Sequence, residues 1–143
     1  MNALMLSNRS RLGLVSLDAP LISNLAIWSN IALIPQYHRN MPVQEAMALA
    51  EGLLHRLGMD SIAQKRNSSL TTEERFCAML LRAATVQDAV LVLDRPFTIL
   101  TNLGDGRFIM ETLQKVDDLI AEAHIFDYSW EESRYGGDDD PEN

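Results

Sequence analysis

The stretch from Leu70 to Thr98 constrains the fold more than any other, because it joins an amphipathic helix directly to an apolar strand. Thr71 and Glu74 have the spacing of a capping box, in which each side chain accepts a hydrogen bond from a backbone N–H near the other, so a helix is predicted to begin there. Val90 to Leu93 (VLVL) is a continuous apolar run, typical of a strand covered on both faces, and it ends in an acid, Asp94.

The segments on either side alternate in the same way. Arg11 to Leu17 is rich in Leu and Val and predicts a short buried strand. An apolar segment after it predicts a helix that ends before Pro35, because the residue before a proline disfavours helical backbone. Apolar residues recur at helical spacing over 42–57 and again over 108–116, and a last strand is predicted within 119–128. Strands alternating with helices predict an α/β fold with a small, partly parallel sheet and flanking helices.

The chain of 143 residues fits one domain, which we place at 1–135, with a helical subdomain at about 26–86. Its net charge of −8 argues against nucleic acid as a partner. Acids near the end of the chain predict a disordered acidic tail over 136–143. No run approaches the ~18 apolar residues that a spanning helix needs, so we expect a cytoplasmic protein without direct membrane insertion.

The order of these segments resembles the ATP-binding (ATPase) subunits of ABC transporters. Asn30-Ile31-Ala32-Leu33 is similar to the segment that opens the family's helical subdomain, Leu70 to Ala83 to its signature helix, and Val90 to Asp94 to its Walker B strand. The resemblance covers roughly residues 11 to 125. It implies the fold of the C-terminal two-thirds of a P-loop ABC ATPase domain.

The signature itself is different from the family's. Where the family has LSGGQ, this chain has a vestigial signature, Leu70-Thr71-Thr72-Glu73-Glu74. The resemblance implies that a polyphosphate lies there, and Glu73 and Glu74 would repel it. The reading that we favour is that both acids stabilise the first turn of a helix, where the helix dipole attracts negative charge.

The residues expected to carry catalysis are also changed. The resemblance implies that Asp94 holds Mg²⁺ through water, which makes it the one candidate metal ligand. The next residue, a water-polarising glutamate in the family, is Arg95, and a guanidinium accepts no proton. The family's Q-loop glutamine would fall near Leu17, and His124 lies about where its switch histidine would be. We therefore expect no catalytic residue, with His124 as a possible switch and no confident nucleotide ligand.

The Walker A motif G-x-x-x-x-G-K-[ST] needs a Gly-Lys pair to wrap and neutralise phosphates. The lysines of this chain, Lys65 and Lys115, each follow a glutamine. We therefore expect a degenerate, truncated relative without Walker A, and no cofactor, with ATP and Mg²⁺ bound only if a partner supplies the P-loop.

Three functions remain open at this point. The first is a non-catalytic protein that contacts an ABC permease or an intact ATPase subunit, and that reaches the inner membrane only through such a partner. The second is a nucleotide-hydrolysing subunit completed by a partner's P-loop. The third is an unrelated α/β interaction protein.

The resemblance also implies that the Walker A strand lies beside Val90–Leu93. Without it we expect an exposed strand edge, and therefore self-association, unless Arg11–Leu17 or the last strand pairs there.

Overall fold

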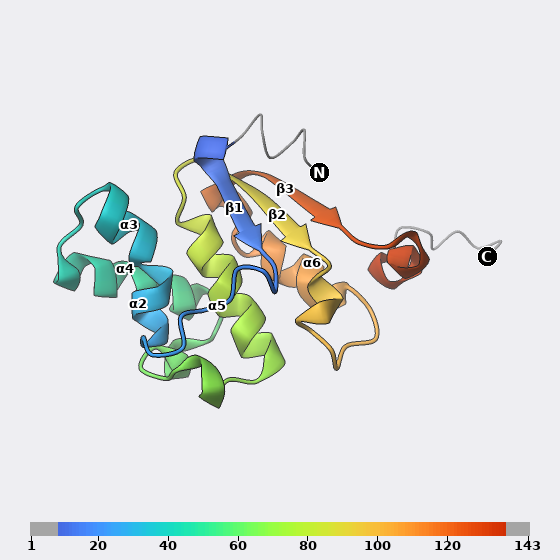
Figure 1. Cartoon of the computed structure of the whole chain (residues 1–143), viewed down its shortest axis with the longest axis horizontal. Coiled ribbons are helices and arrows are strands. Elements are labelled where there is room, and N and C mark those ends of the chain that lie inside the picture. Colours follow the sequence, from blue (N-terminus) through green and yellow to red (C-terminus); the bar gives the residue numbers. More distant parts are fainter. Residues whose placement is uncertain (1–8, 137–143) are drawn as a thin grey trace.

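A three-stranded sheet forms the centre of the protein, which is described here over residues 9–136 of a computed structural model (Figure 1). The strands are β1 (Leu12–Val15), β2 (Ala89–Asp94) and β3 (Ile120–Phe126), in the order β1-β2-β3. Both pairings are parallel, so the predicted α/β class is confirmed and the described sheet is parallel throughout. The predicted acidic tail lies outside the described residues, apart from Gly136.

The middle strand is β2, and all six of its residues are buried. Its two edges are occupied, one by β1 and the other by β3, with Val15 level with Leu93 and Phe126 level with Asp94. The expected exposed edge of Val90–Leu93 is therefore wrong, and the alternative, pairing by the first and last strands, is confirmed. Because all three strands run in the same direction, their carboxyl ends meet at one edge of the sheet.

Helix α5 (Thr72–Ala84) packs against the sheet and is the central helix of the core. Its predicted capping box is present: Glu74 N–H donates to Thr71 Oγ1 at 3.1 Å, and Thr71 N–H donates to Glu74 Oε1 at 2.9 Å. The helix is buried on more than one face, as Phe76, Cys77 and Leu81 show. It lies so close to β1 that a Cβ on Gly13 would sit 2.6 Å from the Ala83 carbonyl oxygen.

Three helices precede α5: α2 (Ile27–Ile31), α3 (Leu33–His38) and α4 (Val43–Arg56). Helix α4 agrees with the predicted 42–57 element. The predicted helix that ends before Pro35 is confirmed by α2, which ends at Ile31, but the sequence did not predict that a second helix, α3, begins at Leu33 with Pro35 in its first turn. A proline is tolerated there, since the first N–H groups of a helix have no intrahelical partner.

A buried asparagine holds the loop before α2. Asn30 is fully buried, and its side-chain oxygen accepts a hydrogen bond from Ile22 N–H at 2.7 Å. Its amide nitrogen donates to the carbonyl oxygens of Ile22, Leu25 and Ala26. The Asn30 side chain thus satisfies backbone groups that a buried loop would otherwise leave unpaired.

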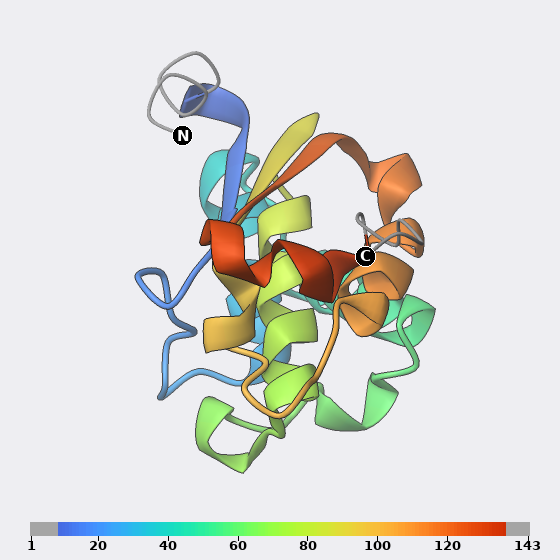
Figure 2. The same cartoon turned by 90° about the vertical axis from the view of Figure 1, so that its right-hand side faces the viewer.

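After β2 the chain forms α6 (Arg107–Gln114), whose predicted inner face is confirmed by the burial of Ile109 and Thr112. Beyond β3 the short helix η6 (Ser129–Tyr135) crosses in front of the sheet and lies beside the start of α6 (Figure 2). The other 3-10 helices are η1 (Arg9–Arg11), η2 (Asp60–Ile62), η3 (Asn67–Ser69), η4 (Pro96–Thr98) and η5 (Asp117–Leu119).

Among the helices that the structure describes, none has the length and apolar character that would let it cross a bilayer.

Candidate functional site

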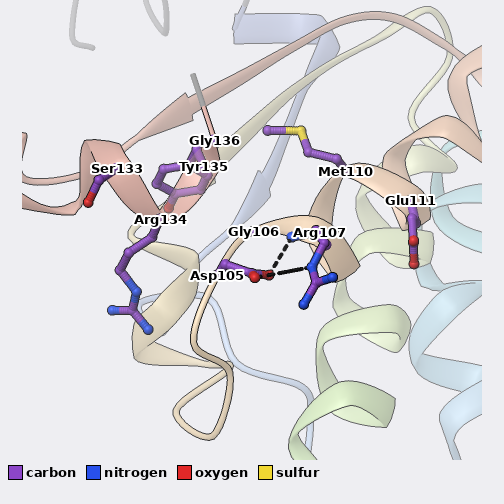
Figure 3. Close-up of a pocket in the computed structure, with 9 residues that line it drawn as sticks. All are labelled: Asp105, Gly106, Arg107, Met110, Glu111, Ser133, Arg134, Tyr135 and Gly136. Atoms are coloured by element: carbon purple, nitrogen blue, oxygen red, sulfur yellow. Dashed lines mark hydrogen bonds and ion pairs between the residues drawn. The ribbon is translucent and has the colours of Figure 1, made fainter. Parts of the chain in front are cut away.

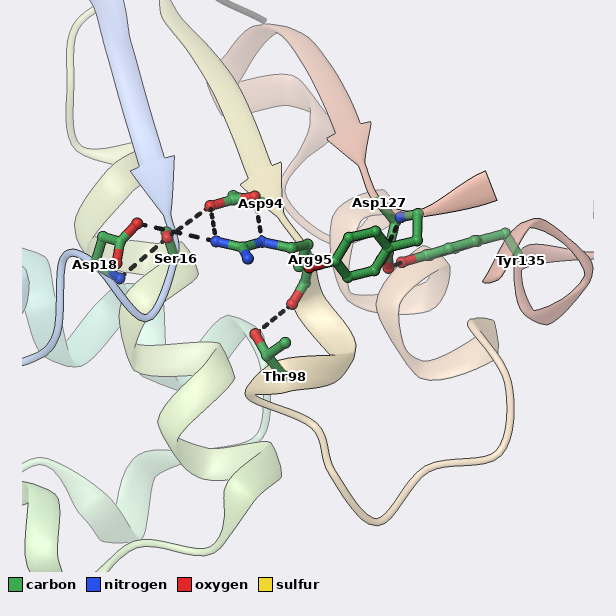
Figure 4. A network of polar contacts seen from close by, with 8 residues as sticks. Ser16, Asp18, Asp94, Arg95, Thr98, Asp127 and Tyr135 are labelled. Atoms are coloured by element: carbon green, nitrogen blue, oxygen red, sulfur yellow. Dashed lines mark hydrogen bonds and ion pairs between the residues drawn. The ribbon is translucent and has the colours of Figure 1, made fainter. Parts of the chain in front are cut away.

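The carboxyl edge of the sheet gathers a polar network around Asp94 (Figure 4). Asp94 is the last residue of β2 and is buried. Arg95 donates to it through two nitrogens, from Nε to Oδ1 at 3.0 Å and from Nη2 to Oδ2 at 3.2 Å. The buried Ser16 hydroxyl, just after β1, donates to Asp94 Oδ2 at 3.0 Å. Both carboxylate oxygens therefore already accept hydrogen bonds from the protein.

The backbone fixes Arg95 in this position. Arg95 has a left-handed conformation, with φ of 47°, which is uncommon for a residue with a side chain. Its N–H donates to the Phe126 carbonyl at 2.7 Å, and its own carbonyl accepts from Thr98 Oγ1 at 2.5 Å. The left-handed turn ends β2 and brings the guanidinium back over the carboxylate of the preceding residue.

The charges in this network stabilise one another. The hydrogen bonds from Arg95, helped by the one from Ser16, hold the pKa of Asp94 below its ordinary value even though partial burial opposes this. Asp94 in turn raises the pKa of the Arg95 guanidinium. Asp18 is a more distant neighbour, with its carboxylate 4.0 Å from Arg95 Nη2. The pair is ionised at neutral pH, and the local charge of Asp94 is balanced by its neighbour in the chain.

This arrangement limits what Asp94 can bind. Mg²⁺ is held by carboxylate oxygens, water and phosphate oxygens in near-octahedral geometry, which requires oxygens that are open to the ion. Here the positive Arg95 guanidinium lies 3.0 Å from Oδ1 and 3.2 Å from Oδ2, so it would repel an approaching cation. Over residues 9–136 no cluster of three or more His, Cys, Asp or Glu side chains is placed to hold a metal ion.

The vestigial signature lies at the start of α5, and its polar groups contact the protein itself. Glu74 and Thr71 form the capping box. Glu73 accepts from Thr72 Oγ1 at 2.9 Å and from Asn102 Nδ2 at 3.3 Å, and the Thr72 hydrogen bond is the main reason that the pKa of Glu73 is lowered. Both acids thus act as first-turn acids at the positive end of the helix dipole.

His124 lies within β3, level with Val92, whereas Asp94 is level with Phe126. The polar contact of His124 is with Glu122 on the same strand, with 2.8 Å between Nε2 and Oε1. The structure therefore brings Asp94, Arg95 and Ser16 together, and it does not bring His124 into their network.

Sequence reasoning missed Ser16, Asp127 and Tyr135 as members of this edge. The Tyr135 hydroxyl donates to Asp127 Oδ2 at 2.6 Å, and burial followed by this hydrogen bond raises the pKa of Tyr135. Ser16 and Asp127 each follow directly after a strand, which is the signal that could have identified them once the strands were known to be parallel.

A hollow of about 370 Å³ lies between the start of α6 and η6 (Figure 3). On one side Arg107 Nε is 3.1 Å from Asp105 Oδ2, and on the other lie Arg134 and Tyr135. The hollow shares only Tyr135 with the polar network of Figure 4. Arg134 forms its ion pair with Glu131, which does not line the hollow, and no candidate site residue from the sequence lines it.

Two curated proteins have related sequences, and both are named as ATP-binding proteins of transport systems. The octopine permease ATP-binding protein P of Rhizobium meliloti is 32% identical over 117 residues, which are 80% of this chain and 42% of that protein. The glutamate transport ATP-binding protein GluA of Corynebacterium glutamicum is 28% identical over 114 residues, 80% of this chain and 46% of that protein. The chain thus spans less than half the length of these relatives. No family model matches it.

Solved structures extend the likeness to the fold. A dimeric bacterial ABC transporter cassette, MJ0796, superposes with a TM-score of 0.63 at 22% identity, covering 87% of this chain and 55% of the cassette. The fold is that of an ABC ATPase cassette.

The same cassette in a post-hydrolysis dimer bound to ADP and Pi gives a TM-score of 0.62 at 20% identity, over 87% of this chain and 54% of that one. The expected resemblance to ABC transporter ATP-binding subunits is confirmed by the relatives and by the cassette fold. The expectation of a protein that works without Walker A stays a prediction.

Proposed function

We propose that this ABC-ATPase-like chain is non-catalytic and acts through contacts with a transporter permease or an intact ATPase subunit. The observation that carries the proposal is the pairing of Arg95 with both oxygens of Asp94. Arg95 thereby pairs with the Asp94 carboxylate, the one candidate ligand for a metal. Arg95 also stands at the position where the resemblance implies a general base.

The start of α5 supports the same reading. A helix N-terminus binds phosphate when its N–H groups are open to the ligand and its surroundings are not negative. Here the capping box occupies backbone donors, and Glu73 adds a second carboxylate to the first turn. An incoming polyphosphate would meet two negative charges in place of open donors.

A contact function is supported by apolar surface on α3 and on the loop before α2. Ile22 and Tyr37 are exposed, and with Leu33 and Ile34 they line a groove of about 380 Å³. An exposed apolar patch of this kind is typical of protein interaction sites. The names of the relatives, which include a permease ATP-binding protein, point to a transport assembly as the source of the partner.

Isothermal titration of the 143-residue chain with Mg-ATP tests the proposal. We expect no binding tighter than about 1 mM, a free energy of roughly −4 kcal/mol. An intact transporter cassette titrated in the same buffer is the positive control. A micromolar dissociation constant for this chain would contradict the proposal.

The alternative, a hydrolase completed by a partner's P-loop, is favoured by one observation: Asp94 is ionised and lies at the carboxyl edge of the sheet. ATP hydrolysis by the chain co-purified with its partner distinguishes this alternative from the non-catalytic proposal. The proposal predicts that Asp94→Asn leaves ATP hydrolysis by the complex unchanged, whereas a partner-completed site predicts its loss. Asp117→Asn, on the exposed η5 turn, is the matched control.

A further inference from the structure

Strand β3 leaves one edge of the described sheet without a partner strand. It pairs with β2 on one side and is the last strand in the order β1-β2-β3 (Figure 1). Ala121, Glu122 and Ala123, in the first half of β3, are exposed. A seven-residue edge of this kind presents a row of backbone N–H and C=O groups to which another strand can pair.

The direction of these backbone groups follows from one hydrogen bond. The Phe126 carbonyl accepts from Arg95 N–H at 2.7 Å and so points toward β2. Because successive residues of a strand direct their backbone groups to opposite sides, those of Ile125 and Ala123 point away from β2. Ala123 therefore presents both a donor and an acceptor at the open edge.

The sequence of β3 is complementary to itself about Ala123. In an antiparallel pair of two copies centred there, Ala123 faces the partner copy's Ala123, and Glu122 faces the partner copy's His124. Because Ala123 forms the hydrogen-bonded pair, the Glu122–His124 pairs are of the non-hydrogen-bonded kind, in which opposing side chains lie closest. Each histidine then lies between two carboxylates, its own strand's Glu122 at 2.8 Å and the partner copy's.

We propose that the chain associates with a second copy of itself through the open edge of β3, as an antiparallel pair centred on Ala123. The small side chains of Ala121 and Ala123 leave room for the second strand. A Glu122 carboxylate faces a His124 imidazole at both symmetry-related positions, where the two can hydrogen-bond, and no two carboxylates are opposed along 121–125. This association does not depend on the loss of nucleotide binding proposed above.

Sedimentation equilibrium of the 143-residue chain tests the association, with a concentration-dependent dimer as the expected result. Ala123→Pro removes the outward N–H and should give a monomer. It leaves the β2–β3 hydrogen bonds in place, because proline is tolerated where the N–H faces outward from an edge strand. A wild-type chain that stays monomeric at all concentrations overturns the proposal.

Charge reversal tests the pairing of side chains. His124→Glu would oppose carboxylates at two symmetric positions and should raise the dimer dissociation constant at least tenfold. Adding Glu122→His to this variant places an imidazole opposite each new carboxylate and should restore the association. Equal association by all three chains would show that β3 is not the interface.

Cross-linking with a short bismaleimide tests the register. Ala123→Cys places the two thiols on directly opposed residues and should give a cross-linked dimer. Ala121→Cys separates them by four strand positions, ~14 Å, and should not. The native Cys77 is buried, so the wild-type chain is the control for its reactivity. Cross-linking at position 121 alone would overturn the proposed register.

Discussion

Asp94 and Arg95 show how a neighbour in the chain sets the electrostatics of a carboxylate at the end of a strand. Asp94 still ends the central strand, at the edge where the three strands finish. Arg95 follows it in a left-handed turn and returns to the carboxylate. The interaction is local, between neighbours in the chain, and Ser16 from the adjacent strand completes it.

This pairing predicts a pH-dependent contribution to stability. The pKa of Asp94 is lowered in the folded protein, so the stabilisation is complete above the ordinary aspartate pKa and is lost as the pH falls through the folded value. We expect Asp94→Asn to lower the free energy of unfolding by ~1–3 kcal/mol at pH 7, since hydrogen bonds to a charged group are lost. Urea denaturation should show the difference shrinking below about pH 4. A difference that is constant from pH 7 to pH 3 would contradict the electrostatic cause.

At the scale of elements, α5 links the helices to the sheet. Its first turn is fixed by the capping box, and its last turn lies against β1 at Gly13. Arg82 on the same helix is half-buried and donates to the carbonyls of Ala19 and Pro20, which ties α5 to the loop after β1. Helix α5 therefore acts as a packing element between the helices and the sheet.

The close approach of α5 and β1 gives a matched pair of glycine substitutions. A Cβ at Gly13 would lie 2.6 Å from the Ala83 carbonyl oxygen and 2.9 Å from a Leu91 methyl, so Gly13→Ala should destabilise the protein by about 1–3 kcal/mol. Gly52 lies within α4, where a Cβ would meet nothing within 4 Å. Gly52→Ala should stabilise the protein by roughly 0.5–1 kcal/mol. Thermal unfolding of both variants checks the prediction, and equal shifts would contradict the contact.

At the scale of the whole molecule, the described sheet has β2 in the middle and two edge strands, β1 and β3. The site at the carboxyl edge and the open edge of β3 are different surfaces, since the Asp94 network involves strand ends and the proposed pairing is centred on Ala123. The two proposals therefore concern separate surfaces: the lack of nucleotide binding concerns the first, and the association with a second copy concerns the second.

Because the Asp94 network and the open edge of β3 are separate surfaces, we expect nucleotide to have no influence on association. The dimer dissociation constant from sedimentation equilibrium should be the same with and without millimolar Mg-ATP, because no differential binding means no shift in the equilibrium. Ala123→Pro, measured in parallel, gives the monomer reference. A nucleotide-dependent change in association would contradict the separation of the two surfaces.

Much of the secondary structure could be predicted from local pattern alone. Capping chemistry at Thr71 and Glu74, helical periodicity over 42–57 and the apolar run of Val90–Leu93 each act within a few residues, and each prediction is confirmed. Pro35 shows the limit of this reasoning, because a proline can end one helix or begin the next, and packing decides between them.

The sequence by itself determined which residues could not do the family's chemistry: Arg95 accepts no proton, and Glu73 and Glu74 carry negative charge. These are properties of side chains and need no fold. Only the tertiary structure decided that β2 is the middle strand, that Ser16 reaches Asp94, and that β3 is an edge strand of the described sheet. Strand order depends on contacts between residues far apart in the chain, such as the 78 positions between Ser16 and Asp94, and local sequence pattern carries no information about them.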